Sequence, residues 1–424
     1  MILRNGNLDV NVYDRSVRKR LTMVWERERT GLGDVHPIEN GRPDDAKTIG
    51  EILPLGDGSS VRRNAVFTET LPIRHVGAGA VIGAVNALAA QSAAADTLAV
   101  TVLLPEGSEE SLLRNVVDDI RNTCESVGGK ISYFAGEVSG AVTRPVVSVT
   151  ASGRTFAEHL QPCAAESTDL SADAGLDDEM RRRRGETSRT GEPEEGSRDC
   201  CDGTDILLLG HIGLEGTAIL AEERREELEN RFPVQFVERA AGLRERLVMT
   251  EAVKALTSLT AGGQSWNCPP EVQAKGSERK APKRSDEMEA NRLRHLINLS
   301  AGGIYAALWA LAEESGKGFE VELTDIPILQ ETIEITDYYG INPYQLRSAG
   351  AMLAVIRDGE EMTEMLAEHG VYARVIGHLT DGRDKVICNG EERQSLNRPE
   401  ADSIAGGLCS YNPANIRIEQ GRKK

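Results

Sequence analysis

The chain has 424 residues, of which 40% are hydrophobic and 4% aromatic, and its formal net charge is −18. This length and apolar content suffice for two domains with separate cores. The negative charge argues against a nucleic-acid surface or an anionic membrane as the main partner. The polar N-terminus and seven cysteines without a CxxC pair favour a reducing, cytoplasmic location.

Residues 1–160 predict a mixed α/β domain, because strand patterns and helix patterns alternate along them. The predicted elements are, in chain order, an Arg- and Glu-rich helix at 16–29, a strand at 64–70, an Ala/Gly-rich helix at 76–95, a buried strand at 97–105, an amphipathic helix at 107–129 and strands at 131–140 and 143–153. An acidic, glycine-bearing loop at 30–50 contains Asp45. Clustered carboxylates in such a loop are typical either of a Mg²⁺ site or of a solvated turn.

Three polar stretches separate or follow the ordered parts of the chain. Residues 161–203 show almost no apolar periodicity, so we expect a disordered linker or insertion there. A second polar stretch, at 265–290, predicts an exposed loop inserted into the following domain. The end of the chain, 396–424, is predicted to be a loose tail.

Residues 204–395 predict a second α/β domain. A strand at 206–209 is followed by glycines and by a helix that opens at Thr217, and another amphipathic helix is expected at 248–259. Strands at 373–376 and 385–388 flank an Asp-Gly pair, which predicts a β-hairpin.

A glycine pair, Gly302 and Gly303, precedes a helix with a continuous apolar stripe at Ile304, Ala307, Leu308 and Leu311. Glycines at a helix start allow backbone angles that a side chain forbids. They also leave the first N–H groups open to an anion or to a packed neighbour. Close packing is the commoner of these two uses.

Four segments of the second half resemble, in order, the superfamily of aminoimidazole ribonucleotide (AIR) synthase. This superfamily includes the hydrogenase maturation protein HypE, selenophosphate synthetase and thiamine-monophosphate kinase. The matching segments are DILLLGHIGLEGTAILA (205–221), LSAGGIYAALWALAEESGKG (299–318), IPILQETIEITDYYGINPYQLRSAGAMLAVI (326–356) and GVYARVIGHLTDGRDKVI (370–387). Weaker matches in the first half include PDDAKTI (43–49) and AVTRPVVSVTASG (141–153).

The resemblance implies an α+β, two-domain PurM-like architecture. It also implies that the first domain pairs with its twin in a homodimer and binds ATP with Mg²⁺. By this resemblance Asp45, Asn86 and Glu137 would bind the nucleotide, and Gly302 and Gly303 would border the acceptor substrate. Asp45 and Glu69 would hold the metal.

Three of the family's first-domain motifs are altered in this chain. Ala87 follows Asn86 where the family has an aspartate, and the glycine-rich segment reads YFAGE and keeps only Glu137. The strand that carries a Thr-Asp pair in the family reads Thr68-Glu69 here. We also expect the C-terminal cysteine tail of the maturation dehydratase to be absent, since the chain ends IRIEQGRKK.

Two functional hypotheses follow. The first is an ATP-dependent enzyme that acts on a small molecule or in hydrogenase-type cofactor maturation. The second is a degenerate, non-catalytic relative that kept the dimeric scaffold in order to bind a ligand or a partner protein. A further alternative assigns partner docking to the polar insertions.

Overall fold

The computed structural model describes residues 62–156, 204–260 and 292–399, together with residues 2, 3, 6, 7, 12 and 14–20 and Ile404. The predicted linker at 161–203, the loop at 265–290 and Asp45 lie outside the described residues. The helix predicted at 16–29 is described only as far as residue 20, and Asp14–Arg18 form a short π-helix there.

Five strands form a first sheet in the spatial order β1-β4-β3-β5-β2. Their bounds are Gly6–Asn7 (β1), Arg62–Glu69 (β2), Ala93–Pro105 (β3), Lys130–Ser139 (β4) and Val146–Thr155 (β5). β3 and β4 run parallel, and the other neighbours are antiparallel. The predicted strands of the first half are thus confirmed.

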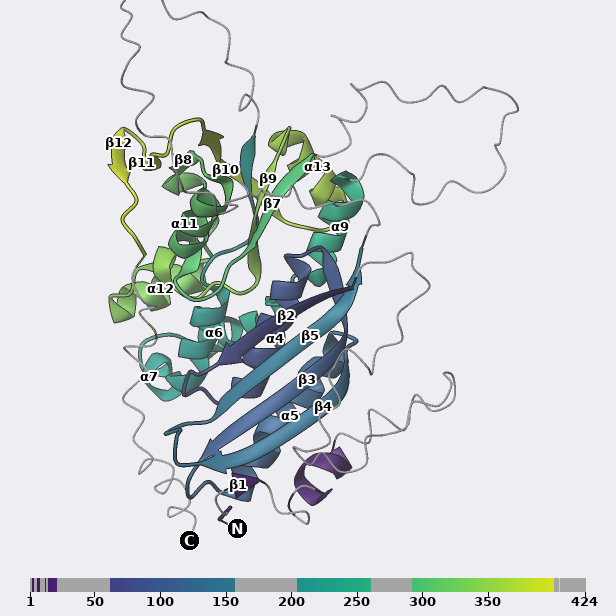
Figure 1. The fold of residues 1–424 in the computed structure, drawn as a ribbon. Helices are drawn as coiled ribbons and strands as arrows, with labels where there is room; N and C mark the ends of the chain where they lie inside the picture. The colour runs from purple at the N-terminus through teal and green to yellow at the C-terminus, as the bar shows by residue number, and fades with distance from the viewer. Residues whose placement is uncertain are drawn as a thin grey trace, which may run out of the picture.

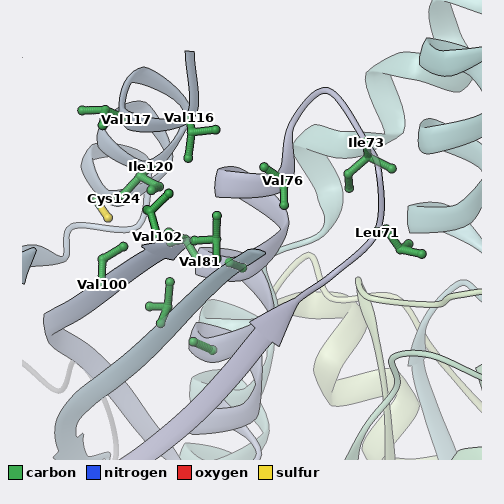
Figure 2. Packing of buried hydrophobic residues seen from close by; sticks show 14 of the residues in the cluster. Leu71, Ile73, Val76, Val81, Val100, Val102, Val116, Val117, Ile120 and Cys124 are labelled. Carbon is green, nitrogen blue, oxygen red and sulfur yellow. The ribbon is translucent and has the colours of Figure 1, made fainter. Parts of the chain in front are cut away.

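Two helices, α4 (Val76–Ala89) and α5 (Glu110–Ser126), cover one face of this sheet (Figure 1). Figure 2 shows how their apolar side chains, such as Val81 and Ile120, meet Val100 and Val102 from β3. The small residues of α4 let the helix lie close to the sheet. A Cβ atom at Gly83 would lie only 2.4 Å from the Phe67 ring.

The helix predicted at 76–95 is wrong beyond Ala89, because β3 already begins at Ala93. Between them Ser92 turns the chain with a positive φ of 56°. The alanines that follow pair with β5, where Ala93 lies opposite Thr155. This ladder partner is distant in sequence, so it overrides the local helix preference of alanine.

Seven strands form a second sheet in the order β12-β11-β8-β10-β6-β9-β7. Their bounds are Asp205–Gly210 (β6), Leu293–Asn298 (β7), Gly318–Glu322 (β8), Ala351–Ile356 (β9), Ala373–Thr380 (β10), Lys385–Asn389 (β11) and Glu392–Ser395 (β12).

Helices cover both faces of the second sheet. The predicted stripe of α11 (Gly303–Ser315) packs on one face, and α9 (Thr250–Thr260) and α13 (Gly359–Glu368) pack on the other. Because β9 is buried on both faces, all six of its residues are apolar and buried.

The hairpin predicted between 373–376 and 385–388 is wrong, because β8 lies between β10 and β11. The Asp-Gly segment instead passes over the start of β8, where the Gly318 N–H donates to the Gly382 carbonyl at 2.6 Å. β11 forms its hairpin with β12. Asn389 and Gly390, an Asn-Gly pair with φ of 62° at the glycine, mark that turn in the sequence.

The two halves meet along helices that follow β6 and precede β9. Their bounds are Leu214–Glu223 (α6), Arg225–Glu229 (α7), Val234–Gly242 (α8), Leu243–Arg246 (η3), Gln330–Tyr339 (α12) and Pro343–Gln345 (η5). The short helix Leu323–Asp325 (η4) instead lies against β10 and β11 of the second sheet. Ile219, Val237 and Ile335 from these helices join the core of the first sheet. Ile404, within the predicted loose tail, is buried in the same core.

None of the helices in the described ranges is long and apolar enough to span a membrane.

Candidate functional site

The residues predicted to form one site fall at separate places. Asp45 lies outside the described residues. Glu69 and the Gly302–Gly303 pair both reach the turn at 343–350, which precedes β9. Asn86 lies on α4, where it contacts residues 247–249 of the second half, and we call this contact region between the halves the seam. Glu137 lies on the outer surface of the first sheet.

Glu69 is the last residue of β2, and the alternation of that strand points it toward the helices with Ala65 and Phe67. Its side chain is 2% exposed. Oε1 accepts hydrogen bonds from the backbone N–H groups of Thr70 and Leu71, at 2.9 and 3.0 Å. Its other carboxylate oxygen, Oε2, faces the second half of the molecule.

Arg347 connects Glu69 to that second half. Its Nη2 atom donates to Glu69 Oε2 and to Glu215 Oε1, both at 2.8 Å. Glu215 lies in the first turn of α6, and its Oε2 accepts from the Ala349 N–H at 3.3 Å. The side chains of Arg347 and Glu215 are 6% and 8% exposed. We call Glu69, Arg347 and Glu215 the Arg347 triad.

The Arg347 triad engages Glu69, the residue that was predicted to bind a metal. Each of the four carboxylate oxygens already accepts a hydrogen bond from a backbone N–H or from the guanidinium. A buried carboxylate with both oxygens occupied would have to break these bonds in order to ligate Mg²⁺. Within the described residues, no three His, Cys, Asp or Glu side chains are grouped as a metal site requires.

The turn that carries Arg347 is held by the starts of two helices. The Gly213 N–H at the start of α6 donates to Ser348 Oγ at 2.9 Å, and the Gly216 N–H donates to the Arg347 carbonyl at 3.1 Å. The Ser348 N–H donates to the carbonyl of Ser300, which lies just before α11, at 3.2 Å. Arg347 is therefore fixed from both sides by backbone contacts.

Gly302 and Gly303 use their conformational freedom for packing. Both are buried, with φ values of 80° and 61°. A Cβ atom at Gly303 would lie 2.5 Å from the carbonyl oxygen of Tyr344 and 2.7 Å from that of Leu346. The structure thus shows a packed neighbour, not an open anion site, at the glycine pair that was predicted to border a substrate.

Asn86 is fully buried on α4, and both ends of its amide are engaged. Nδ2 donates to the Leu247 carbonyl at 2.7 Å, and Oδ1 accepts from the Met249 N–H at 2.9 Å. These bonds fix the segment that leads into α9. These bonds join α4 to the second half, and the predicted nucleotide-binding role of Asn86 would require both of them to open.

Glu137 lies on the opposite side of the first sheet from Glu69. It is exposed on β4, opposite Asn7 and Leu103 in the neighbouring strands, whereas Val138 next to it is buried under the helices. Because the sheet separates the two carboxylates, one bound ion cannot be shared between Glu69 and Glu137.

A cavity of about 10 Å³ lies beside the triad. It is lined by Ile73, Gly79, Ile82, Glu215, Ala218, Ile219, Arg244 and Leu247. This volume suits about one water molecule and is far too small for a nucleotide.

Two charged clusters involve residues of α5. His75 Nδ1 lies 2.9 Å from Asp119 Oδ1, and this hydrogen bond raises the histidine pKa against the opposing effects of burial and Arg244. On α5, Glu110 accepts from Arg15 Nε at 2.5 Å and from Ser16 Oγ at 2.6 Å. Hydrogen bonds from Arg15, Ser16 and Arg114 hold the Glu110 pKa far below its usual range.

Sequence reasoning missed Arg347 and Glu215, although each carries a signal. Arg347 is the only charged residue between positions 341 and 356, in a segment that is otherwise neutral and ends in a buried strand. Glu215 is the only charge between Ile206 and Ala221. A lone charge in an apolar segment needs a partner when the segment is buried, but the sequence does not say which partner.

Two family models match the chain, one in each half. Residues 57–155 match the N-terminal domain of AIR synthase related protein, and residues 264–389 match its C-terminal domain. The two matches occur in the family's order and together span more than half of the chain. The chain belongs to the AIR synthase-related family.

Two proteins similar to this AIR synthase-related chain carry names from hydrogenase formation or maturation. A putative hydrogenase expression/formation protein of Methanocaldococcus jannaschii is 25% identical over 351 residues, which is 81% of this chain and 82% of the relative. A crystal structure of hydrogenase maturation protein HypE has a TM-score of 0.55 at 15% identity, covering 93% of this chain and 98% of HypE.

Two further HypE structures share the fold. A HypE in complex with ATP has a TM-score of 0.54 at 16% identity, covering 81% of this chain and 87% of that chain. A HypE–HypF complex gives 0.53 at 17% identity, covering 80% and 90%. These similarities confirm the two-domain PurM-like architecture. In this chain the described residues do not fit a magnesium–nucleotide site at Glu69, because the Arg347 triad uses the carboxylate oxygens.

Proposed function

We propose that this chain is a HypE-like accessory protein of metallocofactor maturation that works as a dimeric, cytoplasmic scaffold. In this function it binds a small ligand or a partner protein without transferring a phosphoryl group through Glu69. The hydrogenase-formation relative supports the maturation role, since the alignment extends over both halves of the chain.

One observation carries the non-catalytic part of the proposal: the four carboxylate oxygens of Glu69 and Glu215 are all engaged within the Arg347 triad. Phosphoryl transfer depends on positioned metal ions and cations that neutralise phosphate charge. A carboxylate that already neutralises an internal arginine is not available for that task. The engaged amide of Asn86 supports the same conclusion.

The direct test is a phosphate-release assay with Mg·ATP, run beside isothermal titration of the nucleotide. We expect no turnover above the uncatalysed rate. Turnover that Glu69→Gln abolishes while the variant keeps the wild-type melting temperature would contradict the scaffold function. A variant of Arg239, whose ion pair with Glu331 is exposed, serves as the control for removing a charge.

The uncovered face of the first sheet supports pairing with a second copy. No described helix lies over this face, whereas α4 and α5 cover the other (Figure 1). Its two central rows of cross-strand neighbours are uncharged: Val66, Thr150, Ala99 and Tyr133, and then Thr68, Ser148, Thr101 and Ala135. Val66 is 64% exposed. An uncharged sheet face of this kind is stabilised when a partner covers it.

Light scattering after size exclusion tests the pairing. We expect a wild-type dimer at micromolar concentration, and we expect Val66→Asp to increase the monomer fraction because it places a charge within the interface. Ile333→Asp is the matched control, since Ile333 is 50% exposed but lies on α12, away from the sheet. A monomeric wild-type protein, or equal effects of both variants, would refute the pairing.

An ATP-dependent enzyme is the second candidate, favoured by the retained two-domain architecture. Its remaining nucleotide ligands would be Asp45 and Glu137, which is exposed on β4. In this case Mg·ATP would raise the melting temperature, and Asp45→Ala would abolish the rise while Asp44→Ala preserves it. No shift at millimolar Mg·ATP would exclude this candidate.

A further inference from the structure

We infer that the guanidinium of Arg347 serves as a resident cation between Glu69 and Glu215, in the place of a divalent metal, so that the joint between the two halves needs no metal ion. This deepens the proposed scaffold function. It rests on that function in one respect: Glu69 must hold the two halves together and must not take part in phosphoryl transfer.

The geometry of one nitrogen atom supports the comparison with a metal. Nη2 of Arg347 lies 2.8 Å from Glu69 Oε2 and 2.8 Å from Glu215 Oε1. Ca²⁺ binds carboxylate oxygens at about 2.3–2.6 Å. The two oxygens would therefore need to close by only a few tenths of an ångström around an ion at the position of Nη2.

The triad links elements of both sheets. Glu69 ends β2 of the first sheet, Glu215 begins α6 after β6, and Arg347 precedes β9 of the second sheet. All three side chains are less than one-tenth exposed. Without a cation, two buried carboxylates from the two halves would face each other, and their repulsion would push the halves apart.

An arginine suits this position better than a metal would in one respect. Its charge is permanent and covalently attached, so the joint forms at any metal concentration. The backbone hydrogen bonds from Gly216 to Arg347 and from Ser348 to Ser300 fix the segment that carries the guanidinium. Arg347 is therefore a positioning residue that sets how the two halves meet.

The test removes the arginine cation by mutation and then supplies a divalent metal ion in its place. Thermal melting of the full chain is measured without nucleotide in a chelator, in millimolar Ca²⁺ and in millimolar Mn²⁺. We expect the wild-type melting temperature to be the same in all three. Arg347→Ala should melt lower in chelator and regain about 5 °C or more when the divalent ion is present at a hundred times its dissociation constant.

Two controls identify the source of the recovery. The double variant Arg347→Ala/Glu215→Gln lacks one of the two carboxylates and should lose the response to the ions. Arg239→Ala, which breaks the exposed ion pair with Glu331, should show no response to the ions at all.

Several results would overturn the inference. These are a wild-type protein that melts lower in chelator, an Arg347→Ala variant that is unfolded with and without divalent ions, and a recovery that persists in the double variant. ATP turnover would refute the scaffold function through a different readout and would leave these melting experiments unchanged.

Discussion

Replacing Asn86 by alanine separates a structural amide from a nucleotide ligand. The substitution removes both partners of the 247–249 segment at once: the Leu247 carbonyl loses the bond at 2.7 Å, and the Met249 N–H loses the bond at 2.9 Å. Both residues are about 95% buried, so water does not readily replace the amide. Each unsatisfied buried group costs about 1–3 kcal/mol, which gives about 2–6 kcal/mol for the pair.

At about 2 °C per kcal/mol, the expected result is a fall of about 4–12 °C in the melting temperature of the nucleotide-free protein. Gln91→Ala is the matched control, because Gln91 lies just after the C-cap of α4 and the hydrogen bond from its side-chain amide to the Asn64 carbonyl is exposed. We expect that control to lie within about 0.5 kcal/mol of wild type. Differential scanning fluorimetry and urea titration both measure the change.

The opposite result would be a melting temperature that does not depend on the Asn86 amide. If Asn86 served only to bind a nucleotide, Asn86→Ala would melt at the wild-type temperature without nucleotide and would differ only in its response to Mg·ATP. That pattern would refute the structural assignment of this amide.

Three further predictions concern packing and pH. Gly303→Ala should destabilise the protein by about 2 kcal/mol or more, because its Cβ would meet backbone carbonyls at a positive φ, whereas Gly242→Ala, with no atom within 4 Å, should be nearly neutral in chemical denaturation. The raised pKa of His75 stabilises the fold fully below the unfolded pKa of about 6.5, and this contribution is lost as the pH rises through the folded value. Melting temperatures at about pH 6 and 8 should therefore differ more for wild type than for Asp119→Asn. Hydrogen bonds from arginine lower the pKa of Glu110, so its contribution to stability is present above the usual carboxyl pKa and is lost as the pH falls. Glu110→Gln should therefore make the melting temperature depend less on pH in the acid range.

Local patterns in the sequence were sufficient for most of the elements. The stripe at Ile304, Leu308 and Leu311 predicted a helix and the face it buries, and the apolar run of β9 is typical of a strand covered on both sides. The Asn-Gly pair at 389–390 marks the turn between β11 and β12, although the hairpin was predicted at the Asp-Gly pair instead. These features depend on neighbours within a few residues, and spacing in the sequence encodes such neighbours directly.

Contacts between distant segments were decided by the tertiary structure. Glu69 and Arg347 are 278 residues apart in sequence, and Asn86 and Leu247 are 161 apart. β8 separates β10 from β11 for the same reason, since strand order depends on which ladders pack best across the whole sheet. The sequence therefore determined the family and the two-domain scaffold. Whether a carboxylate such as Glu69 holds a metal or an internal arginine depended on which side chain the fold places beside it, because both cations satisfy the same oxygens.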